Sequence, residues 1–207
     1  MRPTRRTQAE RTAATREALV AAGRALFAEQ GFAGVGAEAI VRAAGLTRGA
    51  LYHHFADKTE LFAAVFEAVE ADAIAGIAAA VAEARPPDPL TAMRLAAAAW
   101  LDVATAPDVL RIALVDGPAV LGWMRWREIG GRYGMGLTLD LIAEAVAAGA
   151  IPPQPAEPLA HVVLGAVREG ALYLAAAPDR AQARREVGAV IDRLIGALGE
   201  PVQPRPT

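Results

Sequence analysis

The stretch that decides the fold is Ala39–Leu61, with the sequence AIVRAAGLTRGALYHHFADKTEL. It contains parts of two short helical segments, 37–44 and 47–54, which are separated by Gly45 and Leu46. A glycine at this point can take the positive φ angle of a tight turn, and an apolar residue after it can fill the angle between the two helices. The stretch therefore predicts a helix-turn-helix.

The second of these helices begins with small side chains. Thr47 is expected to cap its N-terminus through the side-chain hydroxyl, and Gly49 and Ala50 follow within the first turn. Small side chains there let the backbone approach base edges or phosphates in the major groove of DNA. Polar tips beyond this turn, and a cation at the start of the next helix, can bind phosphates. The residues predicted to face DNA are Thr47, Arg48, Gly49, Ala50, Tyr52, His53 and Lys58.

The order of these residues resembles the N-terminal signature of the tetracycline-repressor (TetR/AcrR) family: a glycine turn, Thr-x-Gly-Ala-Leu-Tyr-x-His-Phe, then Asp-Lys-x-x-Leu. The similarity covers residues 8–66, and the helical segments downstream fit the family in number and length. The resemblance implies a three-helix DNA-binding domain, assigned to residues 1–56, and a larger helical domain for effector binding and dimerisation, assigned to residues 57–200. Residues 201–207 are expected to form a disordered tail.

The resemblance also implies a role for each residue of the DNA-facing set. Four of them would contact the phosphate backbone: Thr47, Tyr52, His53 and Lys58. Three would face base edges: Arg48, Gly49 and Ala50. The chain departs from the family where the first helix of the pair begins, because it has Val35-Gly36-Ala37 where the family usually has threonine or serine. The backbone amide of Gly36 can still bind a phosphate, but the hydroxyl contact is missing.

Charge is distributed unevenly along the chain. Residues 1–58 carry nine Lys or Arg against five acidic residues, a formal charge of +4, whereas the remainder carries 12 against 18, a charge of −6. A basic first quarter is typical of a segment that meets a polyanion, although a solvated helix face gives a similar bias. Arg2, Arg5 and Arg6 form a basic arm, which is either a solvated terminus or a contact for the minor groove.

Composition and local signals predict an all-α protein. Hydrophobic residues make up 54% of the 207 residues, which excludes a disordered chain and allows a sizeable core. Aromatic residues are only 5%, and abundant alanine favours helices over strands. Capping motifs and Pro/Gly joints predict further helices from Thr7 to Gln30, from Asp57 to about Arg85, and at about 90–105, 107–116, 118–149, 156–177 and 179–198. The 118–149 helix is expected to bend near Gly130-Gly131.

Several kinds of site are excluded by what the sequence lacks. There is no cysteine, so disulfides, thiolate metal sites and cysteine nucleophiles are absent. Three histidines, two of them adjacent, do not form a metal site, and no cofactor is expected. The longest charge-free stretch, 145–156, has 12 residues, so no membrane span is expected, and the N-terminus lacks the apolar segment of a secretory signal.

The second part of the chain holds the candidates for an effector site. Trp123 and Trp126 are three residues apart and share a helix face, as in the rigid aromatic wall of an apolar pocket. Plain core packing explains each aromatic residue equally well. Arg127 either meets an acidic ligand or forms a surface salt bridge. His161 either orients a ligand or is a satisfied interior histidine. The predicted effector-binding residues are Trp100, Trp123, Trp126, Arg127, Tyr133 and His161.

The last two predicted helices carry broad apolar stripes with small residues between them. A single-chain core explains part of this pattern, and the resemblance favours a homodimer built as a four-helix bundle from these two helices of each subunit.

These observations predict a cytoplasmic, homodimeric transcription regulator that binds a near-palindromic DNA operator. It is expected to be a repressor that leaves the operator when a small apolar or amphipathic effector binds the second domain. A helical enzyme is the first alternative, but no nucleophile with a nearby base and no phosphate cradle is present. A protein-interaction module with a vestigial DNA-binding domain is the second, and duplex binding would separate it from a regulator.

Overall fold

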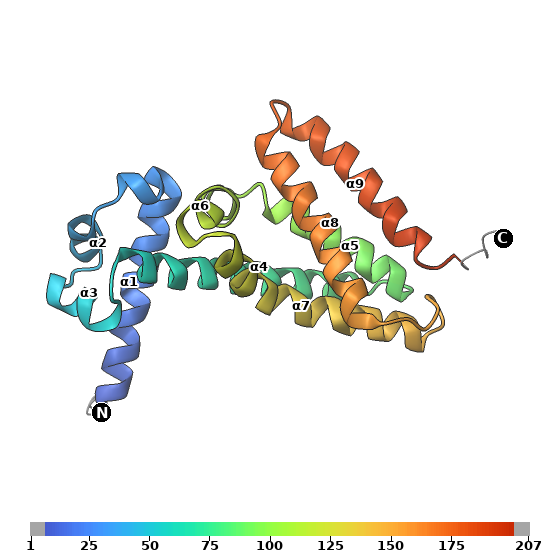
Figure 1. Ribbon diagram of the computed structural model, residues 1–207. Coiled ribbons are helices and arrows are strands. Elements are labelled where there is room, and N and C mark those ends of the chain that lie inside the picture. Colours follow the sequence, from blue (N-terminus) through green and yellow to red (C-terminus); the bar gives the residue numbers. More distant parts are fainter. Residues whose placement is uncertain (1–6, 201–207) are drawn as a thin grey trace. The chain divides into compact units, whose positions relative to one another are not determined.

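The computed structural model describes residues 7–200, and every regular element in that range is a helix (Figure 1). The predicted all-α fold is therefore confirmed. The arm carrying Arg2, Arg5 and Arg6 and the predicted tail 201–207 lie outside the described residues. In chain order the elements are α1 (Gln8–Gly34), α2 (Ala37–Ala43), α3 (Arg48–His54), α4 (Lys58–Ala84), α5 (Pro89–Val103), η1 (Val109–Asp116), α6 (Gly117–Leu121), α7 (Trp123–Ala147), α8 (Ala156–Ala176) and α9 (Arg180–Ala197).

Side-chain caps start the helices where the sequence predicts them. At α1 the Thr7 hydroxyl accepts a hydrogen bond from the Glu10 amide at 3.2 Å, and the Glu10 carboxylate accepts one from the Thr7 amide at 2.7 Å. Asp57 accepts from the Glu60 amide at 2.9 Å at the start of α4. Asp88 caps α5 in the same way. Each cap satisfies an amide that has no partner within its helix.

The expectation of one helix over 118–149, bent near Gly130-Gly131, is wrong. α6 ends at Leu121, Gly122 takes a φ of +75°, and α7 then runs from Trp123 to Ala147. The break lies at Gly122 because a glycine adopts a positive φ without steric cost. The preceding element, η1, is a π-helix instead of the expected α-helix, a form that occurs in short stretches and often near functional sites.

The chain divides into two compact units, which are described separately. The first contains the described residues up to 70 together with 107–126, and the second contains 71–106 and the described residues from 127 onward. The division expected between residues 56 and 57 is a division by function, whereas these units are divided by packing.

The first unit is built around an aromatic core. α1 packs on α2, α3 and η1. Phe27 of α1 meets Phe62 of α4 edge to face, with ring centroids 5.3 Å apart, a favoured geometry for aromatic pairs. Gly23 lets α1 approach α4 closely, because a Cβ there would lie 3.1 Å from Val65. The largest fully buried side chains of this unit are Trp126, Phe27, Phe62, Phe66, Leu19, Ile40, Leu51, Leu61 and Ile112.

The second unit contains a layer formed by α5, α8 and α9, which pack against one another (Figure 1). Gly170 of α8 allows the close approach of α9, since a Cβ at this position would lie 2.7 Å from Val187. Leu101 of α5 and Ala171 of α8 are fully buried, and Ile195 of α9 is nearly so.

α8 is unusually apolar for a helix that is so exposed. Among the described residues it is the one helix whose length and composition would suit a membrane span, with a mean hydropathy of 1.3, yet only 22% of that window is buried. Val162 and Tyr173 are 69% and 58% exposed. On α9, Val190 and Leu194 are also exposed. We call these four residues the α8–α9 apolar face.

Candidate nucleic-acid interface

The turn between α2 and α3 has the geometry that the sequence predicts. Gly45 takes a φ of +66°, and the Leu46 amide donates to the Val41 carbonyl at 2.8 Å. The Thr47 hydroxyl accepts from the Ala50 amide at 3.2 Å and caps α3. The predicted turn and N-cap are confirmed, and together they fix the orientation of α3 relative to α2.

α3 has one buried side and one exposed side. Leu51 is fully buried, and Phe55, which follows the helix, is 5% exposed, so both are core residues. On the opposite side, the predicted DNA-facing residues of α3 are accessible to solvent. Tyr52 is 45% exposed, Ala50 is half-buried, and Thr47, Arg48, Gly49 and His53 are exposed. The polar tips of α3 are thus accessible to a nucleic acid.

Arg48, the first residue of α3, lies on its exposed side. Its Nη1 atom is 3.2 Å from Oε1 of Glu38 on α2, and its guanidinium lies 5.5 Å from the centroid of the Tyr52 ring. About two thirds of both charged side chains is exposed. An ion pair this exposed contributes little stability, so the guanidinium can exchange the carboxylate for a phosphate or a guanine edge.

Lys58 has a structural contact that the sequence did not reveal. Its ammonium donates to the carbonyls of Phe32 and Val35, each at 2.9 Å, and lies 3.9 Å from the centroid of the Phe32 ring. It therefore stabilises the carbonyl end of α1, where a positive charge is favourable. An ammonium has three donors, so the predicted phosphate contact would use the third.

Gly36 is the exposed N-cap of α2, with a φ of −90° and no side-chain cap. A Cβ added there would meet no atom within 4 Å. The position therefore has room for a phosphate, and equally for the hydroxyl-bearing side chain that the resemblance leads one to expect.

The segment 107–126 packs on the helices of the first unit through ion pairs that sequence analysis missed. Arg24 donates to Asp108 through Nε at 3.0 Å and Nη2 at 2.7 Å. Arg125 binds Glu60 through two parallel hydrogen bonds of 2.7 and 2.8 Å. These partners are 84 and 65 residues apart, and no local pattern in a single sequence reports such pairs.

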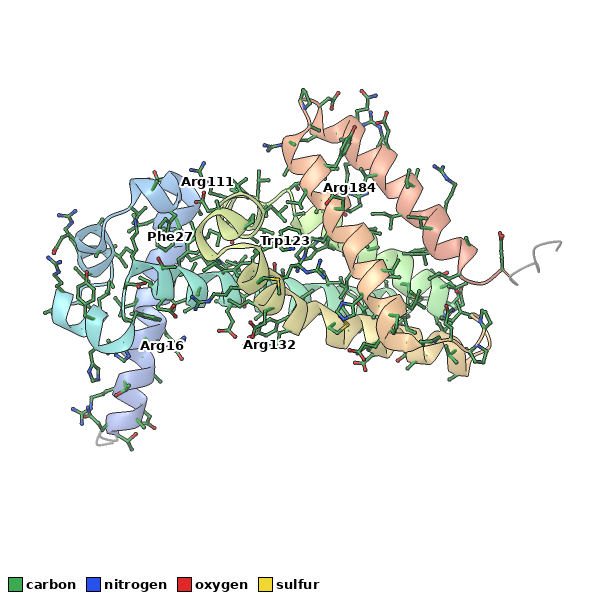
Figure 2. The ribbon with its side chains drawn as sticks, in the orientation of Figure 1. Arg16, Phe27, Arg111, Trp123, Arg132 and Arg184 are labelled. Carbon is green, nitrogen blue, oxygen red and sulfur yellow. The ribbon has the colours of Figure 1, made fainter. Side chains whose placement is uncertain are left out.

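Two further contacts hold the same segment to the first unit. The Phe32 amide, at the end of α1, donates to Asp116 at 2.7 Å. Arg111 lies against Gly31, whose φ is +72°, and a Cβ there would overlap the guanidinium (Figure 2). Gly31 thus supplies a positive φ angle within α1 and leaves room for the Arg111 guanidinium.

These ion pairs shift the pKa values of their carboxyl groups. The hydrogen bonds from Arg125 hold the pKa of Glu60 below its usual range. Burial opposes ionisation of Asp108, but hydrogen bonds from Arg24 and the Val109 amide outweigh it, and the pKa of Asp108 is also lowered. A carboxyl with a lower pKa in the folded chain stabilises the fold at neutral pH.

Acidification is therefore expected to destabilise the protein through these two carboxyl groups. The stabilisation is complete above the pKa of the unfolded groups, about 4, and is lost as the pH falls through their lower folded-state values. The Glu60→Gln/Asp108→Asn variant is expected to melt at a lower temperature at pH 7 and to lose less stability on acidification to about pH 3. Thermal unfolding followed by circular dichroism measures both. Glu83 is exposed, so the control variant Glu83→Gln is expected to behave as the unmodified protein. If the unmodified protein, the double variant and the control lost equal stability on acidification, Glu60 and Asp108 would not be the groups responsible.

The six predicted effector-binding residues divide between the two units. In the first unit, Trp123 and Trp126 have ring centroids 5.0 Å apart. Trp126 is 1% exposed and donates through Nε1 to the Ala113 carbonyl at 2.7 Å, whereas Trp123 is 53% exposed. The pair thus joins a core residue to an exposed one (Figure 2).

The other four candidates belong to the second unit. Trp100 is buried, Tyr133 is half-buried, and Arg127 and His161 are exposed. Among the six, the structure brings together the rings of Trp123 and Trp126. The effector-site assignment as a whole stays a prediction.

Comparisons with known proteins match both parts of the chain. Residues 19–65 match the family model described as bacterial regulatory proteins, tetR family, and residues 90–198 match the tetracyclin repressor-like C-terminal domain. The crystal structure of a TetR-family transcriptional regulator from Pectobacterium atrosepticum is 31% identical, with a TM-score of 0.81 over 97% of this chain and 100% of that one. A putative tetR family regulator from Shewanella sp. is 25% identical, with a TM-score of 0.64 over 87% and 97% of the two chains.

The matches to curated relatives cover a shorter part of the chain. The HTH-type transcriptional regulator CymR of Pseudomonas putida is 48% identical over 67 residues, which are 32% of this chain and 33% of CymR. The regulator AcrR of Shigella flexneri is 36% identical over 80 residues, 39% of this chain and 37% of AcrR. The chain thus spans about a third of the length of the curated relatives it matches.

Proposed function

Because the chain belongs to the tetR family of bacterial regulatory proteins, we propose that it is a cytoplasmic, homodimeric repressor that binds a near-palindromic DNA operator. The observation that carries this proposal is the exposed side of α3. A capped helix shows Arg48, Tyr52 and small residues to solvent, while Leu51 and Phe55 anchor it to the core. A helix of this kind is what the major groove of DNA admits.

The proposed contacts follow from the chemistry of each side chain. The Arg48 guanidinium binds a guanine edge, since its planar donors match the two acceptors of that base. Thr47, Tyr52, His53 and Lys58 bind phosphates, and Gly49 and Ala50 let the backbone approach the bases. Gly36 offers its amide to a further phosphate. Phosphate contacts supply most of the affinity, and the few base contacts supply the sequence preference.

The dimer uses the α8–α9 apolar face. Val162, Tyr173, Val190 and Leu194 expose apolar surface that a soluble protein normally covers. A two-fold axis would pair this face with its own copy, and α8 and α9 of both subunits would then form a four-helix bundle. A membrane is the other apolar partner that α8 could take, but Arg168 and Glu169 lie within the helix and would be costly in a lipid core.

An effector would act through the segment 107–126. This segment belongs to the first unit by packing. Its C-terminal end lies in α7, which continues into the second unit, and the turn 104–106 joins its N-terminal end to α5 of that unit. An effector bound in the larger helical domain would favour a conformation in which the two α3 helices are spaced too differently to occupy successive major grooves. To weaken operator binding tenfold, the effector must bind the released conformation more tightly than the DNA-bound one by about 1.4 kcal/mol.

Selection of binding sites from random duplexes by the full-length protein tests the proposed function. We expect enrichment of a near-palindromic sequence with half-sites about one helical turn apart, and binding that weakens steeply with salt. No enrichment, or affinity indifferent to salt, would contradict DNA recognition and favour a protein-interaction module. An enzyme is a weaker candidate, because the regulators that match this chain are named as transcriptional regulators.

The Gly36→Ser variant is expected to tighten operator binding about five- to thirtyfold, since one added neutral hydrogen bond contributes about 0.5–1 kcal/mol in each of the two half-sites. The serine fits, because nothing lies within 4 Å of its Cβ position. Its hydroxyl can cap α2 and bind a phosphate. Electrophoretic mobility shifts with the selected duplex measure the change. Gly36→Ala adds the Cβ without the hydroxyl and serves as the control; equal affinities of the two variants would show that Gly36 does not face a phosphate.

A further inference from the structure

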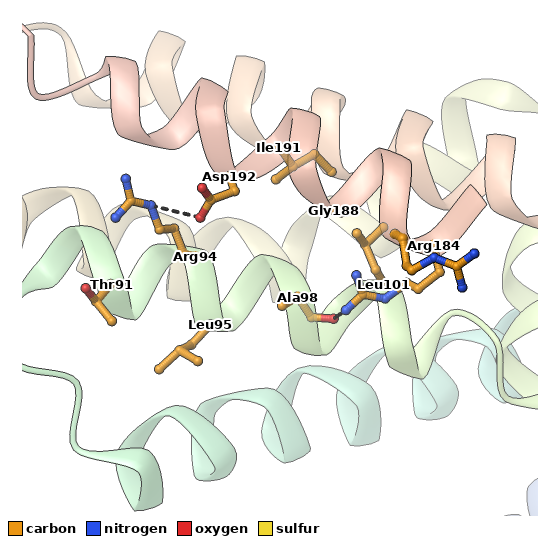
Figure 3. Close-up of a pocket in the computed structure, with 10 residues that line it drawn as sticks. Thr91, Arg94, Leu95, Ala98, Leu101, Arg184, Gly188, Ile191 and Asp192 are labelled. Atoms are coloured by element: carbon orange, nitrogen blue, oxygen red, sulfur yellow. Dashed lines mark hydrogen bonds and ion pairs between the residues drawn. The ribbon is translucent and has the colours of Figure 1, made fainter. Parts of the chain in front are cut away.

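A groove of about 350 Å³ runs between α5 and α9 in the second unit (Figure 3). We call it the α5–α9 groove. Its apolar lining comes from both helices: Leu95 and Leu101 of α5, and Ile191 of α9. Leu95 is 36% exposed, while Leu101 and Ile191 are buried and fix the floor. The volume lies within the range of small-molecule sites, and none of the six predicted effector residues lines it.

Three arginines line the same groove: Arg94 of α5, and Arg184 and Arg185 of α9. Asp192 is the acidic residue among the lining side chains, so the groove carries an excess of positive charge. Residues 59–207 as a whole carry a formal charge of −6. The groove is therefore a positive, partly apolar site on an acidic part of the chain.

Arg184 is held rigidly. Its Nε donates to Asp102 at 2.6 Å, and its Nη2 donates to the Ala98 carbonyl at 3.0 Å. Its Nη1 lies over Gly188, where a Cβ would be only 2.7 Å away. The glycine thus leaves room for the guanidinium at the wall of the groove, and Arg184 fixes the shape of that wall.

Arg94 and Arg185 are the arginines with free donor capacity. Arg94 Nε lies 3.1 Å from Asp192 Oδ1 (Figure 3), but this buried nitrogen makes no hydrogen bond of good geometry within the part of the chain that the structure describes. Its Nη2 lies beside Gly196, again where a Cβ would be 2.7 Å away. Arg185 is exposed and has no ion pair among residues 7–200.

We propose that the α5–α9 groove is a second ligand site, separate from the effector site and from α3, and that it binds an amphipathic organic carboxylate. The carboxylate pairs with Arg94 or with Arg185, since guanidinium groups bind carboxylates through strong charge-assisted hydrogen bonds. The hydrocarbon part lies on Leu95 and Ile191 and covers their apolar surface. A neutral ligand would leave the positive charge of Arg185 without an anion, and a small anion would leave the apolar floor of the groove exposed.

The site stays open in the proposed dimer. At 100° per residue, Arg185 and Asp192 lie about 140–180° around α9 from Val190 and Leu194. A partner subunit on the α8–α9 apolar face therefore does not cover the groove.

Calorimetric titration of the full-length protein with octanoate tests the ligand class. We expect octanoate to bind at least about tenfold more tightly than octanamide, which lacks the charge, and than acetate, which lacks the hydrocarbon chain. Failure of octanoate to bind up to its solubility limit would overturn the proposal, and so would equal binding of octanoate and octanamide.

Two arginine variants locate the site. Whichever of Arg94→Gln and Arg185→Gln removes the guanidinium that binds the carboxylate is expected to weaken octanoate binding about tenfold, the cost of one charged contact of about 1.4 kcal/mol. Arg193→Gln is the matched control, because Arg193 is exposed on α9 and does not line the groove; it is expected to bind as the unmodified protein. Unchanged binding in both groove variants, or an equal loss in the control, would place octanoate elsewhere and overturn the proposal. Operator binding without octanoate is measured in parallel, so that failure of this site is distinguished from failure of the proposed function.

Discussion

Replacing Arg48 and Tyr52 together by alanine is expected to weaken binding of the selected operator by about a hundredfold or more, because each half-site of a dimer loses a base contact of about 1–3 kcal/mol and a phosphate contact. Both side chains are exposed on α3 and make no contact with the core anchor Leu51 that the structure records. The fold and the dimer are therefore expected to remain, as checked by thermal unfolding and light scattering. Fluorescence anisotropy with a labelled duplex measures the affinity.

Glu38→Gln is the control that separates two explanations of this loss. Arg48 pairs with Glu38 across α2 and α3, so a loss caused only by breaking that pair would appear equally in Glu38→Gln. If Arg48 binds DNA, removing the negative charge of Glu38 leaves affinity unchanged or improves it. Undiminished binding by the Arg48→Ala/Tyr52→Ala variant would contradict the assignment of α3 as the recognition helix.

Placing two charges on the α8–α9 apolar face is expected to convert the dimer to a monomer. In Val190→Arg/Leu194→Arg, a two-fold interface would have to bury four unpaired charges in place of four apolar side chains, each of which contributes about 1.5–3 kcal/mol when fully buried. The dimer dissociation constant is expected to rise at least about a thousandfold. Both side chains are already exposed in the single chain, so the monomer is expected to fold. Size-exclusion chromatography with light scattering measures the change.

Loss of the dimer is also expected to abolish tight operator binding, since one α3 alone contacts a single half-site. The matched control is Val115→Arg, because Val115 is an apolar residue of η1 with 48% exposure and lies outside this face. A dimer that persists in Val190→Arg/Leu194→Arg would place the interface elsewhere. A second variant on α8, Val162→Arg, tests the same face from the other helix.

Local signals in the sequence predicted the helix-turn-helix well. The positive φ of Gly45, the caps at Thr7, Thr47 and Asp57, and the buried Phe55 all depend on residues close in the chain. Such features follow from backbone sterics and from hydrogen bonds within one turn, which a single sequence records directly.

Features that depend on distant residues were not predictable in the same way. The sequence left Trp126 equally open to a pocket or a core role, and its bond to the Ala113 carbonyl is a tertiary contact. The ion pair of Arg24 with Asp108 joins residues 84 positions apart. Gly122 rather than Gly130-Gly131 interrupts the helix, and composition alone does not say which of several glycines takes a positive φ.

The packing of 107–126 with the N-terminal helices has a consequence for modular exchange between regulators. A chimera that grafts only residues 7–70 onto another body would leave behind Asp108, Asp116 and Arg125, the partners of Arg24, Phe32 and Glu60. The transplantable piece is discontinuous in sequence, so swapping binding specificity between relatives requires moving both stretches or rewriting α3 in place.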